Sequence, residues 1–142
     1  NRDLTNEEVY RQVSFCAPYL EVIEEMTLME FFRFHNQFKS FINGFSIKEI
    51  IEEIGLKDSI NKQIRYYSSG MKQRVKLAQA IFSDVSIVLL DEPCSNLDSK
   101  GIELYHSLIK KYCTEKLVIV CSNDEVEYSF AKDRITILDY KK

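Results

Sequence analysis

The chain has 142 residues, of which 45% are hydrophobic and 29% charged, and it contains 9 Phe and 8 Tyr. This composition is typical of a folded globular protein and excludes intrinsic disorder, because many aromatic side chains must be buried. The net charge of −3 argues against general nucleic-acid binding, which usually leaves a basic footprint. The apolar runs are a few residues long, far short of the roughly 20 that span a bilayer.

The first part of the chain is predicted to hold one strand and two helices. Residues 13–16 form a short apolar strand that ends before Pro18, since proline cannot continue a ladder. From Thr27 to Phe38, apolar residues recur at steps of three and four, which predicts a helix. Ser46 and the glutamate three residues later form a capping box, and the helix that they open ends at Gly55.

The middle of the chain is predicted to alternate between helix and strand. A loop at 66–70 leads into a helix from about Met71 to Phe82. Residues 86–90 form a continuous apolar strand, of the kind buried on both faces of a parallel sheet. Asp98 or Ser99 then caps a helix that extends to about residue 112.

The last part continues this alternation and completes a predicted α/β layer. We expect a second buried strand at 117–121, a short helix at about 124–130 and a third strand at 135–138. Such an order favours parallel pairing with right-handed crossovers. The predicted organisation has three parts: the end of a core strand with its following loop (1–19), a helical subdomain (20–82) and an α/β subdomain (83–142).

Two adjacent carboxylates give the strongest chemical signal. Four aliphatic residues, 87–90, end in Asp91 and Glu92, followed by Pro93. The carboxyl edge of a parallel sheet is where open α/β folds bind ligands, so both acids are candidates for a site. On this segment alone, a plain strand followed by an acidic turn explains the pattern equally well.

Two further segments flank these acids in the sequence. Ser68, Ser69 and Gly70 open a helix, where free N–H groups and the helix dipole favour an anion. The simpler alternative is an ordinary helix N-cap. Downstream, residues 95–98 (Ser-Asn-Leu-Asp) are by themselves a turn and a cap.

Together, these segments resemble the nucleotide-binding domains of ATP-binding cassette (ABC) ATPases. Residues 67–71 (Tyr-Ser-Ser-Gly-Met) resemble the Leu-Ser-Gly-Gly-Gln signature, and 72–75 resemble the basic stretch that follows it. Residues 87–92 are similar to a Walker B strand with its glutamate, and 95–98 to a D-loop. The resemblance implies an α/β fold: a partial P-loop NTPase-like core with parallel strands plus an α-helical subdomain.

The resemblance also assigns roles in binding ATP and Mg²⁺. Asp91 would hold the metal and Glu92 would be the general base. Asn123 stands where the family usually has a switch histidine, and its amide can still donate a hydrogen bond to a γ-phosphate. The residues expected to bind nucleotide across a subunit interface are Ser68, Ser69, Gly70, Met71 and Asp98.

Three departures from the family pattern accompany the match. The 142 residues contain no phosphate loop, Gly-x-x-x-x-Gly-Lys-Ser/Thr, and we expect it upstream of Asn1. Pro18 stands where the Q-loop glutamine is expected, and Gln12 lies on the wrong side of the strand. Asn123 cannot carry a positive charge as histidine can.

The resemblance implies the ATP-hydrolysing subunit of a transporter. We expect it to act as a dimer of nucleotide-binding domains, bound to a transmembrane permease at the cytoplasmic face of the membrane, without nucleic acid. Two alternatives stay open. One is a non-transport ABC ATPase in DNA repair, chromosome organisation or translation. The other is a regulatory module with weakened catalysis, which the altered glutamine and histidine positions favour and the intact Glu92 disfavours.

Overall fold

The computed structural model describes residues 5–140, without the side chain of Leu138. No helix in this range is long and apolar enough to cross a membrane. The strands are β1 (Val13–Cys16), β2 (Ile87–Asp91) and β3 (Leu117–Cys121). The α-helices are α1 (Asn6–Gln12), α2 (Leu28–Phe38), α3 (Ile47–Glu53), α4 (Ser69–Ile81) and α5 (Ser99–Tyr112), and the 3₁₀ helices are η1 (Lys57–Ser59), η2 (Ile64–Tyr66), η3 (Glu125–Tyr128) and η4 (Ile137–Tyr140).

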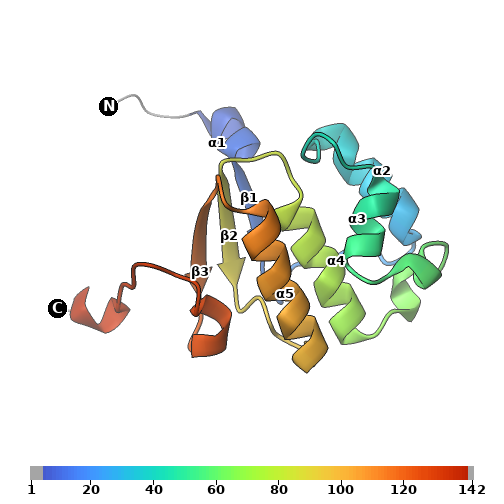
Figure 1. The fold of residues 1–142 in the computed structure, drawn as a ribbon. Helices are drawn as coiled ribbons and strands as arrows, with labels where there is room; N and C mark the ends of the chain where they lie inside the picture. The colour runs from blue at the N-terminus through green and yellow to red at the C-terminus, as the bar shows by residue number, and fades with distance from the viewer. Residues whose placement is uncertain (1–4, 141–142) are drawn as a thin grey trace.

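The three strands form one parallel sheet in the order β1-β2-β3. In the register, Ile87 of β2 pairs with Val13 on one side and Leu117 on the other. Helices α4 and α5 lie on the same side of the sheet, and α2 and α3 lie beyond α4 (Figure 1). The predicted parallel α/β layer with an attached helical part is therefore confirmed.

Burial of the strands differs from the prediction. Val88 and Leu90 point into the core and are buried, but the alternate residues of the sheet are not. On β3, Leu117 and Ile119 remain 57% and 45% exposed, so the prediction that both apolar strands are buried on both faces was wrong. The reason is that α4 and α5 cover a single face (Figure 1), and two-faced burial requires helices on both sides.

The end of the chain also differs from the prediction. The expected strand at 135–138 is absent: residues 133–136 have no regular structure and η4 begins at Ile137. Ile135 and Ile137 are 76% and 74% exposed. A strand needs a neighbour for its N–H and C=O groups, and within residues 5–140 the ladder of β3 is formed with β2 alone. The predicted helix at 124–130 is reduced to η3.

The helical part forms as the capping signals indicate. Ser46 and Glu49 make the predicted capping box of α3, and Thr27 and Glu30 make another at the start of α2. A third capping box opens α1, a helix that the sequence analysis missed. One continuous hydrophobic cluster joins these helices to the sheet, and burial of each large side chain in it contributes about 1.5–3 kcal/mol.

His35 on α2 is held by polar contacts with the end of α4. Its Nδ1 lies 3.0 Å from Nε2 of Gln79, and its Nε2 lies 3.0 Å from Oγ of Ser83. The hydroxyl of Ser83 donates to the Gln79 carbonyl oxygen at 2.6 Å. The amide of Gln79 donates to Nδ1, so the ring is neutral with its proton on Nε2. Burial, followed by the charge of Lys39, lowers the pKa of His35 from 6.5 to about 4.

This depressed pKa predicts a loss of stability in acid. The unfolded chain binds a proton at His35 below pH 6.5, whereas the folded chain does so only near pH 4. Stability is therefore full above pH 6.5 and falls as the pH drops through this window. We expect the free energy of unfolding to fall by about 1–2 kcal/mol from this group between pH 7 and pH 5, after screening by solvent.

Urea denaturation of the chain and of the His35→Gln variant at both pH values measures this contribution. The variant has no titrating ring, so its decrease between pH 7 and pH 5 should be smaller by that amount. Equal decreases in both proteins would show that the contacts of His35 do not hold its neutral form.

Candidate functional site

The two acidic residues lie at the carboxyl edge of the sheet. Asp91 is the last residue of β2 and pairs in register with Cys121 of β3. Asp91 is half-buried and Glu92 is exposed. Because β2 and β3 are parallel, Asn123, two residues after β3, follows the same edge. The structure thus brings Asp91, Glu92 and Asn123 to one end of two neighbouring strands.

Glu92 occupies an unusual backbone conformation. Its φ is 42°, in the left-handed region, which non-glycine residues adopt at a cost of roughly 1–3 kcal/mol. The Glu92 N–H donates to the carbonyl oxygen of Cys121 at 3.0 Å, and the Ser95 N–H donates to the Glu92 carbonyl oxygen at 3.1 Å. Asn96 is a second left-handed residue, with φ 64°. The turn at 92–96 is therefore strained at Glu92, whereas asparagine adopts the left-handed region readily, and the turn is stabilised by a contact with the next strand.

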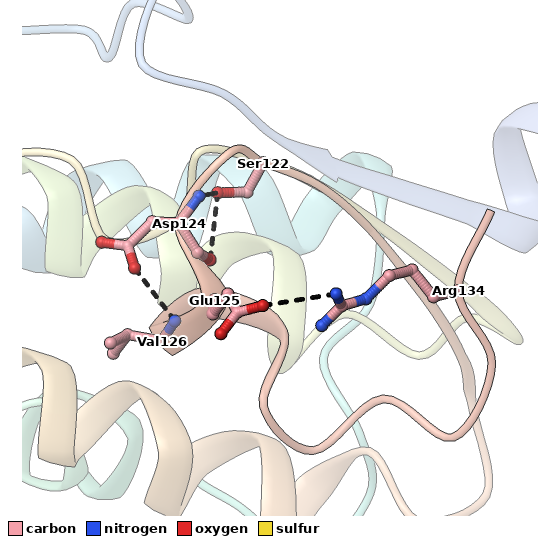
Figure 2. A network of polar contacts seen from close by, with 5 residues as sticks. All are labelled: Ser122, Asp124, Glu125, Val126 and Arg134. Carbon is pink, nitrogen blue, oxygen red and sulfur yellow. Dashed lines mark hydrogen bonds and ion pairs between the residues drawn. The ribbon is translucent and has the colours of Figure 1, made fainter. Parts of the chain in front are cut away.

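The segment after β3 is organised by its own polar groups (Figure 2). We call residues 122–128 the switch segment. The Asp124 N–H donates to Oγ of Ser122 at 2.9 Å, and the Val126 N–H donates to Oδ1 of Asp124 at 3.0 Å. Glu125 forms an ion pair with Arg134 at 3.3 Å. The two hydrogen bonds turn the chain at Asn123, which is exposed. The ion pair lies at the surface and contributes little to this turn.

The signature segment, Ser68–Met71, opens α4. Ser68 is the N-cap, and its Oγ accepts a hydrogen bond from the Met71 N–H at 3.2 Å. The other backbone N–H groups of this first turn lie at the positive end of the helix dipole. Ser68 and Ser69 are exposed, and Gly70 and Met71 are half-buried. The simple N-cap alternative is therefore correct for Ser68, and it is compatible with an anion site at the same place.

A pocket of about 220 Å³ joins the signature segment to the D-loop, residues 95–98. A Cβ added to Gly70 would lie 2.9 Å from the carbonyl oxygen of Asn96. Only glycine at position 70 therefore lets the two segments approach each other this closely. Oδ1 of Asp98 accepts from the Gly101 N–H at 2.8 Å and lies 3.7 Å from Nη2 of Arg74. The pocket is lined by Ser68, Ser69, Gly70, Met71, Arg74, Asn96, Leu97 and Asp98.

A larger hollow of about 500 Å³ lies at the opposite end of the strands. Its lining includes Gln12, Ser86 and Lys116 but none of the predicted site residues. The Nζ of Lys116 already donates to the carbonyl oxygens of Ile81 and Ser83, at 2.8 and 2.7 Å. We do not place the site there, because the convergent polar groups lie at the carboxyl edge.

Helix α4 connects the signature to the other parts of the site. Its Gln73 is buried, and Nε2 donates to the carbonyl oxygen of Pro93 at 2.8 Å, one residue after Glu92. On the segment that contains the altered Q-loop position, Lys76 donates to the carbonyl oxygen of Pro18 at 2.7 Å and Lys72 pairs with Glu24 at 2.5 Å. The helix therefore contacts both the turn of Glu92 and the segment at 18–24.

Sequence reasoning missed Gln73 and Arg74 as part of this arrangement. Gln73 lies four and seven residues before Leu77 and Ala80, on the buried face of α4. A polar residue at a buried helical position signals a specific hydrogen bond, because its amide must be satisfied. Arg74 has a buried Nε without a hydrogen-bond partner among the described residues, beside the D-loop.

The thiol of Cys94 lies in the turn that follows Glu92. Cys94 is buried two residues after Glu92. Burial, and then the charges of Glu127 and Asp124, raise the pKa of Cys94 to about 12, and burial likewise raises the pKa of Cys16 to about 12. Both of these buried thiols are therefore protonated at neutral pH.

Two solved structures of ATP-binding cassettes have a similar fold. A putative ABC transporter ATP-binding protein from Pyrococcus furiosus superposes with a TM-score of 0.72 at 20% identity, covering 84% of this chain and 60% of that chain. A dimeric structure of the cassette MJ0796, in a post-hydrolysis state bound to ADP and Pi, has a TM-score of 0.72 at 26% identity, covering 88% and 60%. The fold of this chain is thus that of an ATP-binding cassette.

The chain belongs to the ABC transporter family, whose model matches residues 1–95. It is 38% identical over 111 residues to the uncharacterized ABC transporter ATP-binding protein YhcH of Bacillus subtilis (strain 168), covering 75% of this chain and 36% of that protein. It is 28% identical over 132 residues to the putative hemin import ATP-binding protein HrtA of Staphylococcus epidermidis, covering 92% and 58%. The chain therefore spans between 36% and 58% of the length of these two curated relatives.

Proposed function

We propose that this chain is the catalytic-carboxylate and signature part of an ATP-hydrolysing subunit of an ABC transporter. The observation that carries the proposal is the placement of Asp91, Glu92 and Asn123 at one sheet edge, with the signature and D-loop in a pocket of their own. Where each ATPase site is formed by two subunits, every subunit has to provide the sheet-edge residues to one site and the signature and D-loop to the other. Membership of the ABC transporter family supports this assignment.

In the proposed mechanism, the residues at the sheet edge act on the nucleotide of their own subunit. Glu92 is the general base that takes a proton from the attacking water, and Asn123 donates its amide to the γ-phosphate. The chemistry is mainly positioning and charge neutralisation.

Mg²⁺ fits the carboxylate at the end of β2. Residues 5–140 hold no cluster of three or more His, Cys, Asp or Glu side chains that would make a complete metal cage. Asp91, half-buried at the sheet edge, suits an ion that proteins hold through one or two carboxylates, with waters and substrate phosphates as the other ligands. When bound, the ion neutralises charge on the phosphates.

The signature and D-loop act on the nucleotide of the partner subunit. Ser68, with the N–H groups of the first turn of α4, binds the γ-phosphate held by that subunit. The residues that we assign to this half of the site are Ser68, Ser69, Gly70, Met71 and Asp98. The dimeric cassette MJ0796, which was solved with ADP and Pi, supports a dimer as the working unit.

An ATP site of this family also needs a phosphate loop. The chain contains no Gly-x-x-x-x-Gly-Lys-Ser/Thr, so no lysine and nested amides are present to hold the β- and γ-phosphates. We propose that this loop lies upstream of Asn1, and we call the polypeptide that includes it the complete protein. Its partners would be a second copy and a transmembrane permease, at the cytoplasmic face of the membrane.

The chain alone should therefore bind ATP weakly. Titration calorimetry with Mg²⁺-ATP is expected to give no binding in the micromolar range, because the main phosphate contacts are missing. The complete protein is the matched control and should bind. Micromolar affinity of the 142-residue chain would contradict the proposal that the phosphates are held elsewhere.

The residue at the switch position should limit the rate. Replacing Asn123 with histidine in the complete protein restores a group that can carry a positive charge and share a proton. We expect the kcat for ATP hydrolysis to rise by about tenfold. Glutamine at the same position is the control, since it keeps an amide and should give no increase. An unchanged kcat for the histidine variant would remove the idea that Asn123 slows hydrolysis.

A further inference from the structure

Glu127 is a buried carboxylate that the proposed mechanism does not use. It lies on η3 in the switch segment, and the residue is 5% exposed. Its Oε1 accepts a hydrogen bond from the Cys94 N–H at 2.7 Å, across 33 residues of sequence. Its Oε2 is buried and has no hydrogen-bond partner within the described residues. Burying a carboxylate is costly, so its single strong contact has to compensate for this loss of solvation.

The backbone of Glu127 is also fixed in place. Its carbonyl oxygen accepts from the hydroxyl of Tyr105, a fully buried residue of α5, at 2.8 Å. Its N–H donates to the carbonyl oxygen of Asp124 at 3.1 Å. The position of the carboxylate is therefore set by Tyr105 of α5 and by Asp124 of the switch segment, so a displacement of Asp124 would shift the carboxylate.

The Glu127 carboxylate contacts the middle of the strained turn at 92–96. Cys94 lies between Glu92 and Asn96, the two residues in the left-handed region. The Gln73 amide holds the carbonyl oxygen of Pro93 from the other side, at 2.8 Å. Strained turns persist only where the surroundings over-determine them, and the Glu127 carboxylate supplies one of these fixing contacts.

We propose that Glu127 is a positioning residue that couples the switch segment to the turn containing Glu92 and to the D-loop. Asn123 and Glu127 belong to one short segment, so a change at Asn123 on contact with phosphate reaches the backbone of Cys94 through the carboxylate. From Cys94 the chain continues in one direction to Glu92 and in the other to Asp98. This inference rests on the proposed function for its role in catalysis, but the contact itself can be tested separately.

Hydrogen exchange on the 142-residue chain tests the contact. Glu127→Ala removes the acceptor and should increase exchange of the amides at 94–97 by about tenfold. Glu127→Gln keeps an oxygen acceptor for the Cys94 N–H and should exchange like the unmodified chain. Glu125→Ala, two residues away on the exposed side of η3, is the matched control and should leave these amides unchanged. Unaltered exchange in Glu127→Ala would overturn the proposal.

ATP turnover of the complete protein tests the catalytic consequence. Glu127→Ala should lower kcat by about tenfold with an unchanged KM for ATP, because it misplaces the base without touching the nucleotide. Glu127→Gln should restore kcat. A rise in KM with kcat retained, or a Gln variant as slow as the Ala variant, would overturn the positioning role. If the unmodified complete protein did not hydrolyse ATP, the proposed function would fail, while hydrogen exchange would still decide the contact.

Discussion

Replacing Glu92 with glutamine in the complete protein should lower ATP turnover by about 100-fold or more and leave a dimer that retains unhydrolysed ATP. The carboxylate is exposed at the edge of the sheet, and the left-handed turn fixes its backbone. Glutamine has nearly the same size and keeps the turn, but it cannot accept a proton from water. Steady-state hydrolysis and size-exclusion chromatography with ATP measure the two effects.

The control for this experiment is Glu125→Gln, which makes the same chemical change on an exposed residue paired with Arg134. That variant should hydrolyse ATP normally and dimerise no more than the unmodified protein. If turnover in Glu92→Gln persists unchanged, Glu92 is not the general base. The alternative of a regulatory module without catalysis would then be favoured.

Gly70→Asp should lower ATP turnover by a similar factor, but without trapping a dimer. A Cβ at this position would meet the Asn96 carbonyl oxygen at 2.9 Å, and the shift that it forces would separate the signature from the D-loop. The added carboxylate would also repel a phosphate at the same pocket. Together these effects are of order 3 kcal/mol, which corresponds to about 100-fold in rate.

The matched control is Gly44→Asp, because a Cβ added at Gly44 would meet no other part of the chain within 4 Å apart from its sequence neighbours. Gly44 has φ 90°, so this variant strains the backbone far from the site. It should lower the unfolding temperature and keep normal turnover per folded molecule. Equal losses of turnover in the two variants would mean that Gly70 acts through stability alone.

The sequence was sufficient for the elements whose signals are local. The strand at 87–91 follows from a run of aliphatic residues, and the helix that begins at Ser69 follows from its cap and apolar spacing. The placement of Asp91 and Glu92 at a sheet edge follows from the same pattern, since the residues after a parallel strand emerge at its carboxyl end. Three motifs in the expected order along the chain then indicated the family.

The incorrect predictions concern residues whose structure depends on partners distant in the sequence, which a local pattern does not specify. Leu117 and Ile119 have the same apolar sequence whether or not a second layer covers them, and the described helices cover only the other face. Ile135 and Ile137 likewise have the composition of a strand but have no ladder to join. Glu127 was missed because its partner, the Cys94 N–H, is 33 residues away, and no local signal marks that contact.

We propose that the acids at the sheet edge and the signature pocket serve two different nucleotides. Mixed dimers of the complete protein, purified with two different tags, test it directly. A Glu92→Gln subunit paired with a Gly70→Asp subunit has both defects in one composite site and leaves the other intact, so we expect about half the normal turnover. A double-mutant subunit paired with an unmodified one has a defect in each site and should be inactive. The reverse result, activity in the second pair and none in the first, would show that each subunit uses its own signature and would contradict the account.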